Sequence, residues 1–311
     1  MKSRIRNPTF GAASTAGVRM YLSRTGPGTA LVLSGTALVL LAVAPFGWRL
    51  GWWPYSFGLY WLMPASGYVG AVAVTLSVLT LALGWSGLRP RGLGVLSVAL
   101  CLSAALVYVP WQYSRVRSTL PPIHDITTDT DNPPAFSAVL PARAAEHAGG
   151  VNYDDPQRPQ LQKVAYPDLA ALKAALPVAK AFNEALHVAK SMPGWTIIAS
   201  DADTGHIEAT QQSRWFRFTD DIVIRVSGDV AGSRIDMRST SRQGHSDYGV
   251  NAARIRAYFG ALRKRVGSTE EPLPRRPSLC LGRRSPSSFS SDRSPRSSGV
   301  RLVRGIDEGH K

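Results

Sequence analysis

The stretch GWTIIASDADTGHIEATQQSRWFRFTDDIVIRVSGDVAGSRIDMRSTS, residues 194–241, decides the fold of the C-terminal half of this chain. Apolar and polar residues alternate in four short runs along it, and this period of two is typical of β-strands. The runs occupy residues 194–200, 206–212, 221–227 and 234–240. Gly and Asp between the runs favour turns, and such short connections make neighbouring strands antiparallel. The pattern therefore predicts a four-stranded antiparallel meander.

The alternation also assigns the two faces of this sheet. Apolar residues lie at alternate positions along the predicted strands, and we expect these side chains to face a core: Ile207, Ile222, Ile224, Ile235 and Met237. Several of the residues between them are charged, and we expect these side chains to face outward: Glu208, Arg225, Asp236 and Arg238. Asp220 has the parity of Ile222, so in a continuous strand its carboxylate points inward and needs a partner.

Helical patterns flank the strands. The segment PVAKAFNEALHVAKSM, residues 177–192, starts at a proline suited to a first helical turn and stops before a Pro-Gly pair. Its apolar stripe is Val178, Phe182, Leu186 and Ala189. A second helix begins at about Gly249 and carries Ile255, Phe259, Leu262 and Val266 on one side. We predict an α+β domain over residues 168–267 with both helices on one face of the sheet, preceded by a Pro-rich, irregular segment 111–167.

The N-terminal part of the chain is apolar instead. Three uncharged segments, residues 29–46, 65–88 and 92–109, approach or exceed the roughly 18 to 20 residues that a bilayer demands. They predict an α-helical membrane anchor of three spans within residues 29–110. A cleavable signal peptide is the competing interpretation of the first segment, but its leader is too long, Pro45 would follow the cut, and two further apolar segments come after it.

Cations near these segments predict their orientation. The leader, residues 1–28, carries Lys2, Arg4, Arg6, Arg19 and Arg24, whereas the first loop carries only Arg49. The positive-inside rule places the leader in the cytoplasm, and three crossings then place the domain outside. Arg115 and Arg117 after the third segment weaken this prediction modestly. We expect a multi-pass membrane protein of the cell envelope with an extracytoplasmic, periplasmic domain.

The net charge of +15 does not indicate nucleic-acid binding. Residues 119–267 hold 17 Lys and Arg against 16 Asp and Glu, a balance of only +1. The excess lies in the leader and in residues 268–311, an Arg-, Ser- and Pro-rich tail that we expect to be disordered. Cys101 lies in the third span and Cys280 in the tail, so the sequence predicts neither an intradomain disulfide nor a thiolate zinc site. We expect no cofactor and no nucleic-acid partner.

Four blocks of the C-terminal half carry a resemblance to a known family. They are IHDITTDTDNPPAF, GWTIIASDADTGHIEAT, RWFRFTDDIVIRV and RIDMRSTSRQGHSDYGVNAARIRAYF. In this order they resemble the signature blocks of the family named domain of unknown function 1499, over about residues 118–267. The resemblance implies a domain often preceded by membrane segments in bacterial members. It implies no activity, because the family has no established biochemical role, and the tail has no counterpart in its pattern.

Polar residues that could carry chemistry surround the last predicted strand. This candidate cluster comprises His124, Asp125, Asp220, Asp221, Arg238, Ser239, Ser241, Arg242, His245, Asp247 and Asn251. A serine hydrolase would use Ser239 or Ser241 with His245 and Asp247, but no G-x-S-x-G turn is present, and triad members usually converge from separate elements. The carboxylates and histidines could instead hold a hard cation if segment 111–167 packs beside the sheet, although no metal-binding spacing appears.

We favour a structural interpretation of this cluster. Ser246 or Asp247 can cap the helix that follows, and Arg238 and Arg242 can form ion pairs with the Asp220-Asp221 carboxylates. The favoured function is a membrane-anchored envelope protein that acts as a non-catalytic binding or structural module. Its expected partners are the lipid bilayer and an envelope lipid or protein.

The alternative is a metal-dependent or hydrolytic enzyme that uses the candidate cluster. Two kinds of space in the structure discriminate between these functions. A water-filled cleft lined by His124, Asp220 and His245 favours the enzyme, whereas a large apolar cavity between the helices and the sheet favours a lipid ligand.

Overall fold

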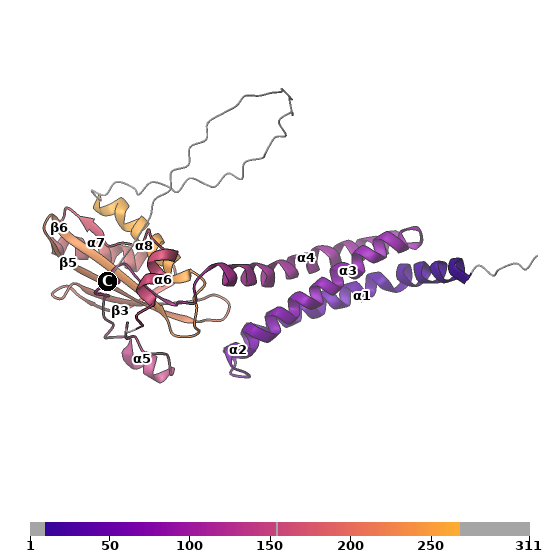
Figure 1. Ribbon diagram of the computed structural model, residues 1–311, viewed down its shortest axis with the longest axis horizontal. Helices are drawn as coiled ribbons and strands as arrows, with labels where there is room; N and C mark the ends of the chain where they lie inside the picture. The colour runs from indigo at the N-terminus through magenta and orange to yellow at the C-terminus, as the bar shows by residue number, and fades with distance from the viewer. Residues whose placement is uncertain (1–9, 154, 268–311) are drawn as a thin grey trace, which may run out of the picture. The chain divides into compact units, whose positions relative to one another are not determined.

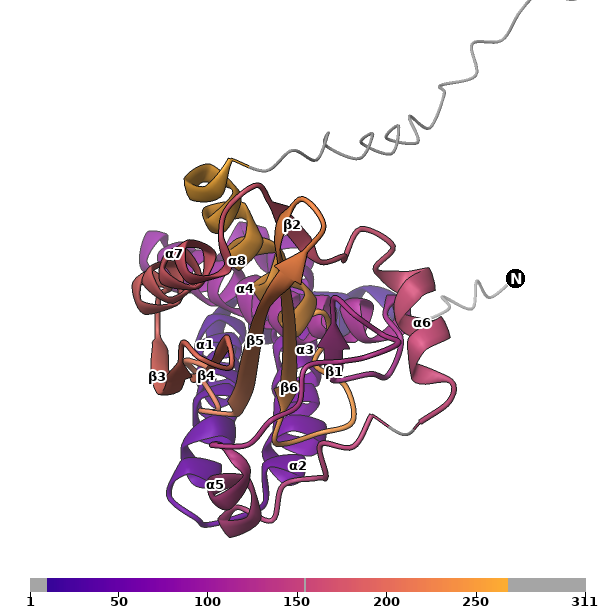
Figure 2. The same cartoon turned by 90° about the vertical axis from the view of Figure 1, so that its left-hand side faces the viewer.

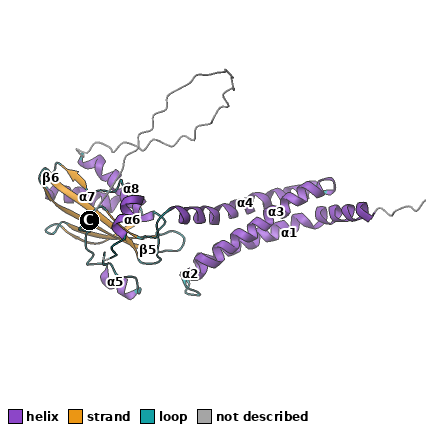
Figure 3. Ribbon diagram, viewed as in Figure 1, coloured by secondary structure: helices purple, strands orange, loops and turns teal. Residues whose placement is uncertain are grey.

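The computed structural model describes residues 10–153 and 155–267. The tail that we expected to be disordered, residues 268–311, lies outside the described residues, as does the start of the leader, residues 1–9. The N-terminal part is helical, and a domain of strands and helices follows it (Figures 1 and 3).

Three helices dominate the N-terminal part. The first, α1, spans Phe10–Arg49. The second consists of α2 (Tyr55–Phe57), a π-helical turn η1 (Gly58–Leu62) and α3 (Met63–Gly84). A 3-10 turn, η2 (Trp85–Gly87), connects it to the third helix, α4 (Pro90–Thr119). All three are long and apolar enough to cross a membrane, so the three predicted apolar helices are confirmed. They extend beyond the apolar segments, because α1 begins inside the leader and α4 continues into the segment that we expected to be irregular.

Small residues bring these helices close together. A Cβ atom on Gly70 of α3 would lie only 3.1 Å from Val107 Cγ2 of α4. The hydroxyl of Ser34 is buried and donates to the carbonyl oxygen of Ala30 in its own helix at 2.8 Å and to that of Ala99 in α4 at 3.1 Å. Such contacts are typical of helices that pack in an apolar medium, where tight packing and satisfied hydroxyls replace the hydrophobic effect.

The domain contains a six-stranded sheet, so the predicted four-stranded meander is incomplete. The four predicted strands are present as β3 (Trp195–Asp201), β4 (His206–Gln212), β5 (Thr219–Asp229) and β6 (Gly232–Ser241), each antiparallel to the next. Two more strands, β1 (Asp125–Thr127) and β2 (Leu172–Ala174), both pair antiparallel with β6. Each has only three residues, and a period of two is not recognisable over so short a run.

Two helices cover one face of the sheet, as predicted. They are α7 (Val178–Ser191) and α8 (Val250–Val266), which lie next to each other beside the strands in Figure 2. The core between them and the sheet contains every apolar side chain that we expected on the inner face of β4, β5 and β6. From the helices it contains Phe182, Ile255, Phe259 and Leu262, which belong to the predicted stripes.

The opposite face of the sheet is also covered, so the prediction that its charged side chains face outward is wrong. Glu208 and Asp236 are fully buried, Arg238 is 3% exposed, and only Arg225 is partly accessible. Residues between β1 and β2, including α5 (Leu140–Ala145), fold over this face, where Phe136 and Val139 pack against Val223. Helix α6 (Arg158–Ala165) lies beside β1, where Gln162 bonds to the backbone of Thr127. The charged side chains stay on the covered face because each has an ion-pair or hydrogen-bond partner.

Candidate functional site

The sheet divides the predicted polar cluster between its two faces. Asp220 and Asp221 are consecutive in β5, so their side chains point in opposite directions. In the register of the sheet Asp220 lies opposite Ser241 of β6, and Asp221 lies opposite Thr240. Asp220, Ser239, Ser241 and Asn251 therefore lie on the face covered by α8, whereas Asp125, Asp221, Arg238 and Arg242 serve the opposite face.

On the helix-covered face, Arg254 of α8 holds the polar side chains together. Its guanidinium donates to Asp220 Oδ2, to Ser239 Oγ at 2.9 Å and to Gln211 Oε1 at 2.6 Å. Ser239 Oγ donates in turn to Asn251 Oδ1 at 2.7 Å, and Asn251 Nδ2 donates to Ser241 Oγ at 3.1 Å. Asp220 thus has the inward orientation predicted for it, but its partner is Arg254 and not Arg238 or Arg242.

The role of Arg254 was missed in the sequence, although its position gives a signal. It lies three residues after Asn251 and four before Tyr258, which are both buried, so it shares the inner stripe of α8 with them. A cation on the inner stripe of a helix requires a buried acceptor on the facing sheet. The inward parity of Asp220 supplies this acceptor.

On the opposite face, Asp221 is fully buried between two arginines. Arg242 donates to it through Nε at 2.9 Å and Nη2 at 2.7 Å, and Arg143 of α5 donates to Oδ2 at 2.7 Å. Arg242 also donates to Glu146 at 2.6 Å. The bond to Asp221 raises the pKa of Arg242, although burial opposes this shift. The pairing of Arg242 with Asp221 agrees with the prediction, whereas Arg143 was not predicted because it lies in the segment that we expected to be irregular.

Arg238 pairs with Asp125 of β1 instead of with the β5 carboxylates. Nε and Nη2 of Arg238 donate to the two carboxylate oxygens at 2.9 and 2.7 Å, and both side chains are 3% exposed. The guanidinium also lies over the rings of Phe136 and Tyr153, 5.2 and 5.3 Å from their centroids. Since Asp125 and Arg238 belong to neighbouring strands, this pair fixes the edge strand β1 to the sheet.

Asp247 caps α8, as predicted. Its carboxylate accepts hydrogen bonds from the backbone N–H groups of Gly249 and Asn251 at 3.0 and 2.5 Å. The side chain is buried, and burial raises the pKa of Asp247 although the two backbone bonds oppose the rise. The carboxylate therefore satisfies free N–H groups of the first helical turn.

Among the described residues, neither the predicted Ser–His pairing nor a cluster of metal ligands forms. The hydroxyl groups of Ser239 and Ser241 bond to Asn251, and no bond of the described chain joins either to His245, which is exposed. His124 is half-buried, and burial lowers its pKa. Within residues 10–153 and 155–267, no group of three His, Cys, Asp or Glu side chains could hold a metal ion.

The polar side chains that Arg254 holds together end at a pocket of about 350 Å³, which we call the junction pocket. On the domain side Asp220, Ser241 and Asp247 line it, together with aromatic residues of the β4–β5 loop. The remaining walls come from α2, η1, the start of α3 and α4, and include Tyr55, Leu59, Tyr60, Met63 and Tyr113. The junction pocket is therefore built by two parts of the chain that are far apart in the sequence.

A second pocket, of about 470 Å³, lies between α3 and α4, and we call it the interhelical groove. It shares Leu59, Tyr60, Met63 and Tyr113 with the junction pocket. Most of its other lining residues are apolar or small, and one cation, Arg117, lies over the ring of Tyr60 with a distance of 5.4 Å from Cζ to the centroid. The two pockets therefore adjoin at these four shared residues.

Specific contacts hold the domain at these pockets. The hydroxyl of Tyr113 in α4 donates to that of Tyr248 at 2.8 Å. Trp48 Nε1 of α1 donates to the carbonyl oxygen of Phe216 at 3.0 Å, and the Phe216 ring packs in the apolar cluster that contains Ala44, Leu59 and Met63. These residues were not among the predicted site residues, because their local sequence does not distinguish them from ordinary residues of an interfacial aromatic belt or of a loop.

Comparison with known proteins identifies the domain and nothing beyond it. A family model described as protein of unknown function (DUF1499) matches residues 125–262, from the first residue of β1 into the last turns of α8. Comparisons with curated proteins and with solved structures give no match. The three apolar helices and the residues that they contribute to the two pockets lie outside the matched range.

Proposed function

We propose, from the site itself, that this chain is a membrane-anchored binding module for a membrane lipid; its residues 125–262 match the model of the DUF1499 family of proteins of unknown function. A single observation carries this proposal. The junction pocket has walls from the domain and from helices that are apolar enough to cross a membrane. A ligand that fits there is amphiphilic and reaches the pocket from the bilayer.

The dimensions and walls of the two pockets suit a lipid tail. Ligand pockets commonly have volumes of about 300 to 1,000 Å³ and largely apolar walls with a few polar groups. The junction pocket and the interhelical groove fall in this range at about 350 and 470 Å³. We propose that an acyl chain occupies the groove and extends to the junction pocket, while Arg117 attracts the lipid phosphate.

The helix geometry gives a reason for the space at this place. Leu59 and Tyr60 line both pockets and belong to η1, a π-helical turn, and such turns occur frequently at functional sites. On the other side of the groove, Pro110 lies inside α4, where it removes a backbone hydrogen bond. The π-helical turn η1 and Pro110 therefore both line the groove, on opposite sides of it.

The polar cluster supports binding or stability more than catalysis. Asp125, Asp220 and Asp221 each accept bonds from buried arginines, and Asp247 is engaged by backbone N–H groups. A general base or a metal ligand needs an oxygen free for its substrate or ion. Both oxygens of Asp125, Asp221 and Asp247 are occupied, whereas Asp220 is held by Arg254 through Oδ2. The proposal therefore assigns the arginine–carboxylate pairs to the stability of the domain.

We further propose that the module works in the cell envelope, with its domain on the extracytoplasmic side. The cations of the leader and of the α3–α4 connection support this orientation, and so do the Trp and Tyr residues between α1 and α3, which suit the interface of a bilayer. In this orientation the junction pocket opens at the outer leaflet. The expected partner is then a lipid of that leaflet.

Photo-crosslinking of the full chain tests the lipid proposal. The protein is reconstituted in vesicles that contain a phospholipid with a photoactivatable group in its acyl chain, and labelled residues are mapped by mass spectrometry. We expect labels to concentrate on residues 59–63 and on Tyr113. Ala71→Phe fills the interhelical groove and should reduce this labelling, whereas Val72→Phe, at an exposed neighbouring position outside the groove, should not. Even labelling along the exposed faces of α3 and α4, unchanged in both variants, would overturn the proposal.

A further inference from the structure

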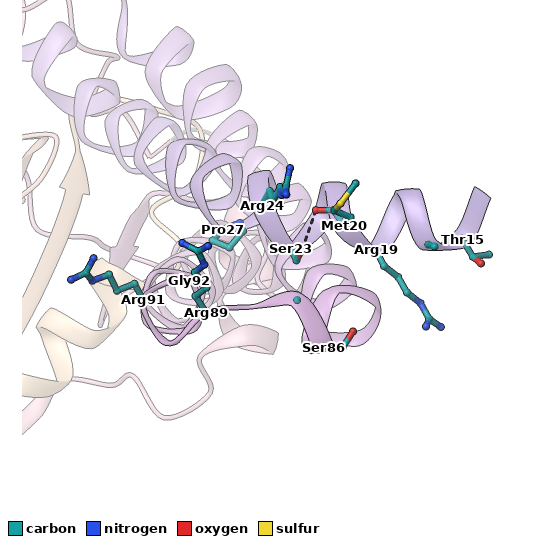
Figure 4. A pocket seen from close by; sticks show the side chains of 12 residues that line it. Thr15, Arg19, Met20, Ser23, Arg24, Pro27, Ser86, Arg89, Arg91 and Gly92 are labelled. Atoms are coloured by element: carbon teal, nitrogen blue, oxygen red, sulfur yellow. Dashed lines mark hydrogen bonds between the residues drawn. The ribbon is translucent and has the colours of Figure 1, made fainter. Parts of the chain in front are cut away.

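The other ends of the long helices enclose a third hollow, of about 1050 Å³. Its walls come from residues 15–27 of α1 and from residues 86–92, which include the end of η2 and the start of α4. Four arginines, Arg19, Arg24, Arg89 and Arg91, line it together with Ser23 and Ser86. Figure 4 shows these residues, and the side chains of Arg19, Arg24 and Arg91 extend from the hollow in different directions. This arginine hollow therefore combines two chain segments that lie about 60 residues apart in the sequence.

The four cations have no counterion within their part of the chain. The first 124 residues of the sequence contain no Asp and no Glu. Among residues 15–153 and 155–267, no carboxylate forms an ion pair with any of the four arginines. In the domain, by contrast, arginines such as Arg238, Arg242 and Arg254 each face a carboxylate. Four cations around one concave surface without an acidic residue produce a positive potential that attracts a mobile anion.

The backbone brings the cations together and adds to the positive potential. A Cβ atom on Gly87 would lie 2.6 Å from Ser23 Oγ, so only glycine lets η2 approach α1 this closely. This approach brings the start of α4, with Arg89 and Arg91, to the hollow that residues 15–27 of α1 line. Pro90 occupies the first turn of α4, and within the described part of the chain no side chain caps that turn. The N-terminal end of a 30-residue helix carries a partial positive charge of its own.

We propose that the arginine hollow binds the phosphate of an anionic phospholipid. The guanidinium group presents a planar pair of donors that matches phosphate oxygens, and a hydroxyl group such as that of Ser86 can donate as well. The hollow lies at the ends of helices that are apolar enough to cross a membrane, where phosphate head groups are concentrated. This site is at the opposite end of α3 and α4 from the interhelical groove and is independent of the function proposed above.

Cations at the ends of spans also direct the orientation of a membrane protein, and that role must be separated from binding. Orientation requires only that cations lie near the correct ends of the spans. Binding requires that they surround the same space. An assay on purified protein in detergent, where orientation has no meaning, therefore measures binding alone.

The test uses the full chain in a neutral detergent, with native mass spectrometry or a fluorescence titration as the readout. The probes are phosphatidylglycerol, phosphatidylcholine and inorganic phosphate. Phosphatidylglycerol should bind more tightly than phosphatidylcholine, and its binding should weaken as the salt concentration rises. Inorganic phosphate should compete only at much higher concentration. If inorganic phosphate competes as well as the lipid, the anion site stands but its occupant is a soluble phosphate compound, which overturns the lipid assignment.

A matched pair of double variants identifies the cations responsible. Arg24→Gln with Arg89→Gln removes two cations of the hollow and should weaken phosphatidylglycerol binding roughly thirtyfold, because each Arg near a membrane surface contributes about a factor of five. Arg49→Gln with Arg115→Gln removes two cations that lie outside the hollow and should leave binding unchanged. All four positions are solvent-exposed, and melting curves check that each variant is folded. Equal binding by the two double variants, or equal affinity for both lipids, overturns the proposal.

Discussion

Asp221 and Arg242 form a two-point ion pair on the sheet face opposite α7 and α8, with N–O distances of 2.9 and 2.7 Å. The side chain of Asp221 is fully buried and that of Arg242 is 5% exposed. Arg143 closes the remaining side of the carboxylate at 2.7 Å. A carboxylate held by two buried guanidinium groups has no free oxygen for a ligand, so this pair stabilises the domain.

Removing the charge of Asp221 should strongly destabilise the domain. Asp221→Asn leaves two buried arginines without their anion, and breaking a buried pair in this way costs about 3 to 5 kcal/mol of unfolding free energy. The control is Asp168→Asn. Asp168 pairs with Arg256 in a similar two-point geometry, but both side chains are almost half exposed, so the expected cost is about 0 to 1 kcal/mol. Denaturant unfolding measures both. Unchanged stability of Asp221→Asn, with stabilisation of the parent by divalent cations, would favour a metal site instead.

Glu208 should make the stability of the domain depend on acid pH. Burial raises the pKa of its carboxyl, but the bonds from His206, Ser137, Ala138 and Val139 outweigh burial and bring the pKa to about 2. Because the folded pKa lies below the value of 4.5 for a free glutamate, the ionised form stabilises the fold. This contribution, up to about 3 kcal/mol, is fully present above pH 4.5 and is lost as the pH falls toward 2.

The variant Glu208→Gln isolates this contribution. Its unfolding free energy should lie below that of the parent at pH 7, and the difference should shrink as the pH falls from 4.5 to 2. Glu146→Gln, at a side chain that is 42% exposed, should show only a small difference at every pH. A Glu208→Gln difference that is independent of pH would show that the charge of Glu208 is not the cause.

Phe216 should matter for docking of the domain against the helices and not for the sheet. Its ring is 6% exposed and packs with Leu59 and Met63, and burial of a Phe side chain is worth about 1.5 to 3 kcal/mol. In hydrogen exchange of the full chain, Phe216→Ala should reduce protection of η1 and leave protection of β5 and β6 unchanged. The control is Trp215→Ala, because that side chain is 52% exposed. Equal loss of protection in the strands would show that Phe216 supports the domain itself.

Gly205 should tolerate no side chain in the turn before β4. Its φ is +68°, and a Cβ atom there would lie 2.0 Å from the carbonyl oxygen of Val226. Gly205→Ala should therefore cost more than about 1 kcal/mol. Gly228→Ala is the matched control, since its Cβ would meet only Val178 Cγ2 at 3.8 Å. Comparable melting temperatures for the two variants would contradict this strain.

The orientation proposed for the chain is directly testable. Protease added to spheroplasts should cut the domain, because residues 118–267 are expected outside the membrane. Detection with a tag on each terminus identifies which part is lost. Complete protection of the domain while the membrane is intact, and cleavage only after lysis, would place it in the cytoplasm.

Ion-pair partners show where sequence reasoning reaches its limit. The parity of Asp220 correctly indicated an inward carboxylate that needs a partner, but several arginines were equally available. The choice of Arg254 depends on α8 packing against that face, and the choice of Asp125 for Arg238 depends on β1 pairing with β6. Both follow from contacts between residues far apart in the chain, and no local spacing encodes them.

The prediction that the charged side chains of the sheet face outward was wrong for the same reason. Glu208 and Asp236 alternate with core residues, and this alternation normally indicates a solvated face. The structure buries them under residues that precede α7, in a segment rich in proline and turn formers. A cover of this kind has neither helical nor strand periodicity, so its packing is not visible in the sequence.

The sequence by itself determined the three apolar helices, the four longer strands, both helices of the domain and the inner face of the sheet. These features follow from hydrophobic period and segment length, which are local properties of the chain. Only the tertiary structure decided the edge strands β1 and β2 and the arginine partner of each carboxylate. It also decided the pocket where α2, η1, α3 and α4 meet the domain and the hollow that four arginines line. Those depend on strand register and on the packing of side chains from distant segments, because a pocket exists only where separate surfaces fail to fill the space between them.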